Sequence, residues 1–208
     1  TNRYLMAVNT GVAVTQADQS GMAIAPIDAP LVSLGVPGLW KFDMDYVPAI
    51  PSVFVNLYNN MWNTNFPLWQ DGSWSERVRV WPVPAGSHAV SNLVQNAWEA
   101  RLPLLTGVAE GEAGKLPANK AGISISRKNV LITAFGDNPD GEGTILRLWE
   151  QAGVSGKCTV KFTAGANVKA VVPIDLRGTV AGKKIAVTNG TFSFNLDKYA
   201  PASFLLIY

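Results

Sequence analysis

Short runs of β-branched and aromatic residues, separated by turn-forming residues, recur along almost the whole chain and restrict what it can fold into. The runs in the first half are RYLMAV, GVAVTQ, GMAIAPI, PLVSLG, SVFVNLY and SERVRVWPV. The second half continues with GISISRK, VLITAF, GTILRLWE, KCTVKFT, VKAVVPIDL, KKIAVT, TFSFNL and SFLLIY. Short strands with frequent turns, and without helices to cover a parallel sheet, indicate antiparallel packing. The sequence therefore predicts an all-β, supersandwich-like antiparallel β-sandwich of about a dozen strands.

Local turn signals predict which runs pair. Asn189-Gly190 stands between KKIAVT and TFSFNL, and Asn-Gly between two β runs is the strongest short hairpin signal. We expect VLITAF and GTILRLWE to pair across GDNPDGE, and an Asn-Thr connection predicts a hairpin of RYLMAV with GVAVTQ. Val78 and Val80 alternate with arginines, which is typical of a half-buried strand.

One segment, SHAVSNLVQNAWEARLPLL, has the period of an amphipathic helix. Its apolar positions are Val90, Leu93, Val94, Ala97 and Trp98. Ser87 is a candidate N-cap, and Pro103 stops a helix that ends before it. We expect one short helix over about 88–101.

The domain organisation follows from length and composition. A chain of 208 residues can form one large all-β domain, so we expect a single β-sandwich over 1–208. The segment GVAEGEAGKLPANKAG is rich in Gly, Ala and charge, and leaves a subdivision near 107–120 open. The start, TNRYLMAVNTG, has neither a first Met nor a signal-peptide pattern, so we expect a piece of a longer product.

The charge balance and apolar runs argue against two classes of partner. The formal charge of +2 comes from 17 basic and 15 acidic residues spread along the chain, which predicts no nucleic-acid partner. No apolar run reaches the ~18 residues of a membrane helix, which predicts no membrane partner. Only 15% of the residues are charged, against about 25% in typical domains, which suggests extensive buried surface, including a face for another domain.

Candidate catalytic and metal-binding residues are few. The single His88 lies at the start of the expected helix and is interpreted as a surface or capping residue. The single Cys158 lies in a strand and is expected to be buried; it excludes an internal disulfide and leaves the compartment open. No zinc-ligand spacing and no Gly-x-Ser-x-Gly elbow is present, so we expect no metal and no triad here.

Two carboxylate groupings remain. Asp43 and Asp45 would share a face if their segment is extended, which keeps a hydrolytic pair open. Asp137, Asp140 and Glu142 lie in DNPDGEG, which is typical of a turn, with a calcium site as the alternative.

The stretch NNMWNTNFPLWQDGSW, residues 59–74, combines three tryptophans with four asparagines. Aromatic faces and amides suit a sugar, whose C–H bonds stack on rings and whose hydroxyls need hydrogen-bond partners. The candidate contact residues are Asn60, Trp62, Asn63, Asn65, Trp69 and Asp71. The alternative is that Trp62, Phe66 and Trp69 bury into the sandwich while the amides satisfy loop backbone groups.

Four stretches, in order, resemble the C-terminal β-domain of glycoside hydrolase family 38, the α-mannosidase family, and of related uncharacterised bacterial hydrolases. They are FVNLYNNMWNTNFPLWQDG, NAWEARLPLL, NVLITAFGDNPDGEGTILRLWEQAG and YAPASFLLIY. The resemblance implies that catalysis, with a zinc ion held by His and Asp, belongs to an upstream β/α domain of the same polypeptide. This chain would be the non-catalytic C-terminal module.

The resemblance also implies roles for particular residues. Arg147 and Glu150 in LRLWE match the family motif, and we expect a charged pair that fixes the strand turning toward Gly153. The 60–71 loop would face the catalytic domain and help to wall its sugar pocket. The alternative is a carbohydrate-binding module that acts on its own through this loop.

Overall fold

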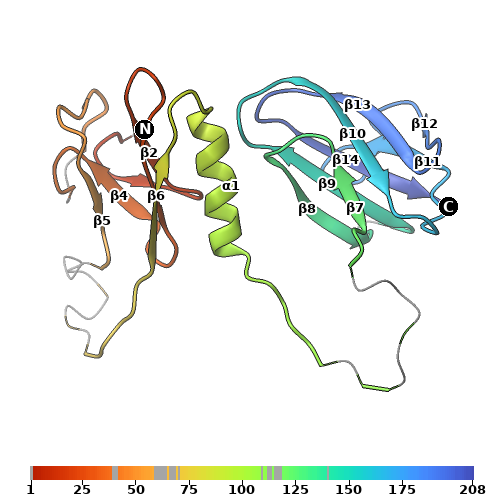
Figure 1. Cartoon of the computed structure of the whole chain (residues 1–208), viewed down its shortest axis with the longest axis horizontal. Helices are drawn as coiled ribbons and strands as arrows, with labels where there is room; N and C mark the ends of the chain where they lie inside the picture. The colour runs from red at the N-terminus through yellow and green to blue at the C-terminus, as the bar shows by residue number, and fades with distance from the viewer. Residues whose placement is uncertain are drawn as a thin grey trace. The chain divides into compact units, whose positions relative to one another are not determined.

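The computed structural model describes residues 2–38, 42–58, 65, 69, 71–108, 110–111, 114, 119–139 and 141–208 (Figure 1). The chain divides into two compact units, Thr1–Leu105 and Thr106–Tyr208. The boundary lies next to the Gly- and Ala-rich segment at which the sequence left a subdivision open.

The described residues of the first unit form two small antiparallel sheets and one helix. One sheet has the order β1-β4-β5, formed by β1 (Met6–Ala7), β4 (Leu31–Leu34) and β5 (Val53–Val55). The other has the order β2-β3-β6, formed by β2 (Val12–Thr15), β3 (Gly21–Pro26) and β6 (Val78–Val83). The expected hairpin between the first two runs is wrong, because β1 pairs with β4 while β2 pairs with β3.

The helix α1 (Ala89–Arg101) confirms the expected helical segment. Its N-cap is His88 and not Ser87: His88 Nδ1 accepts the backbone N–H of Ser91 at 3.2 Å, while the Ser87 hydroxyl donates to the Pro84 carbonyl. The buried side of α1 packs on the β2-β3-β6 sheet, where Leu93 belongs to one apolar cluster with Ala23 of β3. The helix ends at Arg101, two residues before the proline.

The second unit is an antiparallel sandwich, which confirms the expected fold class. Its larger sheet has the order β12-β11-β14-β9-β8 and its smaller sheet the order β13-β10-β7 (Figure 1). The strands in the described part of this unit are β7 (Ile123–Ile125), β8 (Val130–Asp137), β9 (Thr144–Glu150), β10 (Gly156–Phe162), β11 (Ala170–Ile174), β12 (Ile185–Ala186), β13 (Thr191–Leu196) and β14 (Pro201–Ile207).

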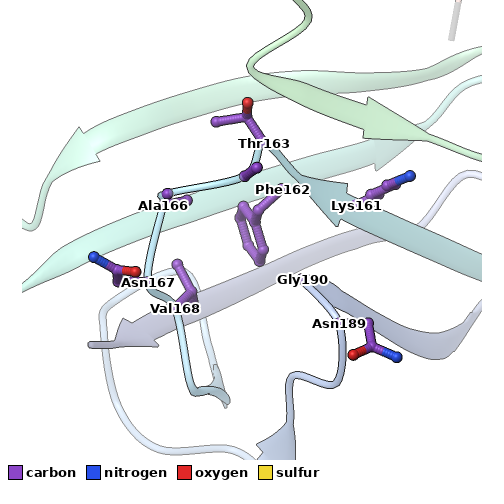
Figure 2. Close-up of a pocket in the computed structure, with 10 residues that line it drawn as sticks. Lys161, Phe162, Thr163, Ala166, Asn167, Val168, Asn189 and Gly190 are labelled. Atoms are coloured by element: carbon purple, nitrogen blue, oxygen red, sulfur yellow. The ribbon is translucent and has the colours of Figure 1, made fainter.

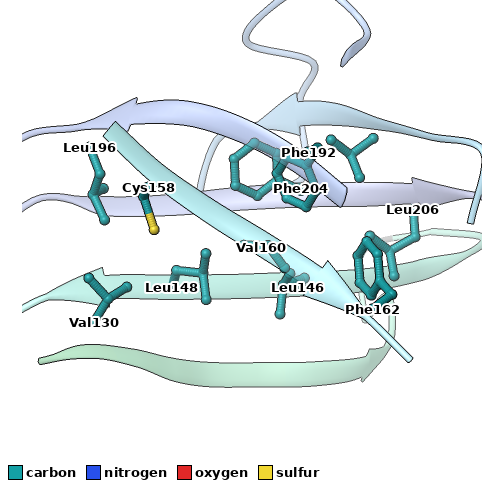
Figure 3. Packing of buried hydrophobic residues seen from close by; sticks show 11 residues of the cluster. Val130, Leu146, Leu148, Cys158, Val160, Phe162, Phe192, Leu196, Phe204 and Leu206 are labelled. Carbon is teal, nitrogen blue, oxygen red and sulfur yellow. The ribbon is translucent and has the colours of Figure 1, made fainter. Parts of the chain in front are cut away.

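Alternating residues of the two sheets fill the interior of this sandwich. Cys158, Val160 and Phe162 of β10 face Leu146 and Leu148 of β9 within one buried cluster (Figure 3). The phenylalanines add edge and stacked contacts, such as the 5.0 Å centroid distance between those of positions 192 and 204. The period-two pattern of the sequence therefore produces a continuous core between the sheets.

The two hairpins expected in this unit have different outcomes. VLITAF and GTILRLWE do pair as β8 and β9. The Asn189-Gly190 turn also forms, with φ of 51° and 72° and reciprocal backbone hydrogen bonds of 2.9 Å between Thr188 and Thr191. Beyond those bonds the expected pairing is wrong, because β12 pairs with β11 and β13 pairs with β10. The turn passes the chain from one sheet to the other.

No helix in the described part of the chain is long and apolar enough to span a bilayer.

Candidate functional site

Half of the sugar-contact residues expected from the 60–71 loop can be placed. Asn60, Trp62 and Asn63 lie outside the described residues. Asn65 and Asp71 are exposed. The Trp69 side chain is 73% exposed, so the expectation that it buries into the sandwich is wrong for this ring.

Trp69 and Asp71 are held together locally. The indole Nε1–H of Trp69 donates to Asp71 Oδ1 at 2.6 Å. This bond uses the only donor of the indole and leaves its apolar faces available. An exposed ring fixed by a neighbouring carboxylate is a suitable surface for stacking against a sugar.

A cavity is lined by residues that precede and follow this loop in the sequence and that the sequence analysis did not select. Leu57, Tyr58, Trp74 and Glu76 line a space of about 250 Å³ in the first unit. The Tyr58 and Trp74 side chains are 69% and 50% exposed, and their ring centroids lie 5.7 Å apart at 32°. Fifteen residues separate Tyr58 from Trp74 in the sequence, so no local pattern indicated that the two rings meet.

Glu76 places a carboxylate at the wall of this cavity. Its Oε2 is buried and has no hydrogen-bond partner among the described residues. An ionised carboxylate only accepts hydrogen bonds, and a buried acceptor without a donor is energetically unfavourable. The cavity therefore combines an aromatic surface with unused acceptor capacity.

The second unit has a larger concavity, of about 360 Å³, between the loop after β10 and the Asn189-Gly190 turn. Figure 2 shows Lys161, Asn167 and Asn189 spread around Phe162. The ring of Phe162 is core and offers no free face. Both asparagines have left-handed backbone conformations, so they serve the turns that carry them. This concavity lacks convergent polar groups.

Arg147 and Glu150 do not form the expected pair with each other. They lie on opposite faces of β9, as residues three apart in a strand must. Arg147 donates to the Leu176 carbonyl at 3.1 Å, while Glu150 points inward and is 0% exposed. The ion pair of Glu150 is with Arg127, whose guanidinium lies 3.6 Å from Oε1.

Glu150 organises the turn that follows β9. Its Oε1 accepts the backbone N–H of Ala152, and its Oε2 accepts those of Gly153 and Tyr199, each at 2.9 Å. Burial by itself raises the pKa of a carboxyl group, but these backbone donors outweigh it and hold the pKa of Glu150 below its usual value. The carboxylate thus joins two turns that are distant in the sequence.

The remaining candidates have structural positions. Cys158 is fully buried in β10, and burial raises the pKa of its thiol. Asp43 Oδ1 accepts the backbone N–H of Asp45 at 3.0 Å, so this grouping is a local turn contact.

The acidic segment between β8 and β9 is the expected turn, in which Asn138 donates its N–H to the Gly143 carbonyl; Asp140 lies outside the described residues. No group of three His, Cys, Asp or Glu side chains placed to hold a metal occurs in the described part of the chain.

The second unit is thus a two-layer antiparallel β-sandwich module in which the Glu150 carboxylate has a structural role. Its residues 129–200 match the family model described as the Glycosyl hydrolases family 38 C-terminal beta sandwich domain. The match confirms the resemblance found in the sequence over these residues, which include the stretch NVLITAFGDNPDGEGTILRLWEQAG. Neither a curated protein nor a solved structure matched the chain in the other two comparisons.

Proposed function

We propose that the chain is a non-catalytic module of a family 38 type glycoside hydrolase and supports the catalytic domain of the same polypeptide. The match of residues 129–200 to the C-terminal sandwich of that family carries this proposal. In this arrangement the zinc ion belongs to the catalytic domain, since the chain contains one histidine and it caps a helix.

A sheet face in the first unit supports the docking of another domain. On the β2-β3-β6 sheet, α1 covers the face of Ala13, Ala23 and Trp81. The register places eight apolar residues on the opposite face: Val12, Val14, Met22, Ile24, Pro26, Val78, Val80 and Pro82. Met22, Val78 and Val80 remain exposed. A wholly apolar, partly exposed sheet face is typical of a surface that a partner covers.

The edge of the sandwich offers further apolar surface. Ile132 and Phe135 of β8 lie opposite Leu148 and Leu146, on the core side of their sheet. They are nevertheless exposed, because β8 is an edge strand. Apolar surface on both units fits a supporting role beside a larger domain.

A lysine on the apolar face of the β2-β3-β6 sheet tests the supporting role. In the full polypeptide we expect Val80→Lys to lower both the melting temperature and hydrolysis of an aryl α-mannoside, because a charge enters the interface. Val90→Lys, on the exposed side of α1, is the matched control and should leave both unchanged. Equal behaviour of the two variants would contradict the proposal.

The isolated chain gives a test of the non-catalytic assignment. We expect no turnover of aryl α-mannosides, with or without added zinc. Turnover at rates typical of enzymes, ~1–10³ per second, would remove this assignment.

A second candidate function is glycan binding by the chain itself through the 60–71 loop, where the exposed Trp69 ring favours it. Trp69→Ala should then abolish glycan binding without unfolding the chain. If binding survives, the loop tryptophan does not carry it.

A further inference from the structure

The cavity lined by Leu57, Tyr58, Trp74 and Glu76, the Tyr58–Trp74 cavity, combines two exposed rings with a carboxylate. The ring centroids lie 5.7 Å apart at an interplanar angle of 32°. This separation leaves no room for a ligand between the two faces. The two rings pack against each other, so a ligand would lie on the outward face of one ring, and both rings are at least half exposed.

Glu76 determines what chemistry the cavity can accept. Its Oε2 is buried and lacks a hydrogen-bond donor among the residues that the structure describes. Because Glu76 lines the cavity, a ligand with a hydroxyl at its edge can donate to this carboxylate. The ligand thus needs an apolar face and a peripheral O–H group.

We propose that the Tyr58–Trp74 cavity is a subsite for one pyranose unit of a glycan. A pyranose presents C–H bonds on its face and hydroxyls at its edge, and a space of about 250 Å³ suits a group smaller than a typical drug-sized ligand. This subsite rests on the proposed carbohydrate-related function and deepens it. It differs from the 60–71 loop in the residues that carry binding.

An organic cation is the competing ligand, since ammonium groups favour both aromatic faces and carboxylates. Aromatic sites for such cations surround the charge with rings set at steep angles. Tyr58 and Trp74 are instead tilted by 32° and pack against each other, so they do not enclose a charge. The geometry therefore favours a ligand with a flat C–H face that lies on one exposed ring.

Titration of the chain followed by NMR of the indole N–H signals tests the subsite. The probes are methyl α-D-mannopyranoside, methyl β-D-glucopyranoside and tetramethylammonium. We expect at least one glycoside to shift the Trp74 signal saturably. Trp74→Ala should weaken that affinity at least ten-fold and Glu76→Gln about three-fold, while Trp69→Ala should change it less than two-fold.

Melting temperatures establish that the variants are folded. Tyr58→Ala, at the more exposed ring, repeats the test if Trp74→Ala lowers the melting temperature. The absence of glycoside binding, loss of binding in Trp69→Ala with retention in Trp74→Ala, or binding of tetramethylammonium alone would overturn the subsite. These outcomes leave the supporting role intact, because that role is tested separately by Val80→Lys in the full polypeptide.

Discussion

Glu150 is buried and ionisable, and both of its carboxylate oxygens accept hydrogen bonds within the fold. It accepts three backbone N–H groups and lies 3.6 Å from Arg127. Arg127 in turn donates to the carbonyls of Val154, Gly156 and Leu196. The glutamate of the LRLWE motif therefore has a structural role, because its carboxylate holds several turns together.

The first prediction is that Glu150→Gln destabilises the second unit by about 3 kcal/mol, because an amide offers one acceptor atom and leaves buried donors unsatisfied. Chemical denaturation of the chain measures this loss. Glu142→Gln, in the exposed β8–β9 turn, is the control and should change stability by less than about 0.5 kcal/mol. Equal losses in the two variants would contradict the role given to Glu150.

The pH dependence of that difference is a second prediction. The folded-state pKa of Glu150 is below its unfolded value, so its contribution is present above the unfolded pKa, ordinarily about 4.3. The contribution is lost as the pH falls through the folded pKa. The stability gap between wild type and Glu150→Gln should therefore be constant from pH 7 to about pH 5 and shrink below pH 4. A gap that widens on acidification would argue against an ionised Glu150.

At the scale of elements, the Asn189-Gly190 turn directs the chain between the two sheets. Gly190 has φ of 72°, and a Cβ there would lie 3.3 Å from the Phe162 carbonyl oxygen. We predict that Gly190→Ala costs about 1–2 kcal/mol, because a non-glycine residue is strained in the left-handed region. Denaturation midpoints measure it, with Gly107→Ala, which has open space around it, as the neutral control.

Elements with strong local signals could be predicted from the sequence. The β8–β9 hairpin, the Asn-Gly turn and α1 each depend on residues close together in the chain. Strand partners across sheets could not be predicted, since β12 and β13 take partners that no turn specifies. The Val78–Val80 alternation correctly indicated a strand, but those valines are exposed while Trp81 and Val83 face the helix.

The residues of the candidate site likewise include some that the sequence could predict and some that it could not. The sequence indicated an aromatic and amide-rich region, and Trp69 is indeed available there. The sequence did not predict the grouping of Tyr58, Trp74 and Glu76, because these residues come together only in the folded chain. Arg127 was missed as the partner of Glu150 for the same reason, being 23 positions away along the chain.

At the scale of the whole molecule, the two units have separate cores. The buried cluster of the sandwich draws all its members from residues 123–206. We predict that a fragment of residues 106–208 folds alone and unfolds in one cooperative transition. Dispersed NMR signals and a single denaturation midpoint would support this, whereas a collapsed fragment without fixed side-chain signals would refute it. Phe204→Ala should lower that midpoint, by about 3–5 kcal/mol in stability.

Because Cys158 is buried in the sandwich, the rate at which its thiol reacts reports how often the sandwich opens. It is the sole thiol of the chain, it is completely covered, and burial raises its pKa. Thiol-reactive reagents can modify Cys158 only in molecules whose sheets have separated. The labelling rate therefore measures how often the sandwich opens. We expect added denaturant to accelerate modification and Glu150→Gln to speed it in native buffer, whereas Val90→Lys should leave the rate unchanged. The opening of one unit can thus be timed in the intact chain without attaching any probe in advance.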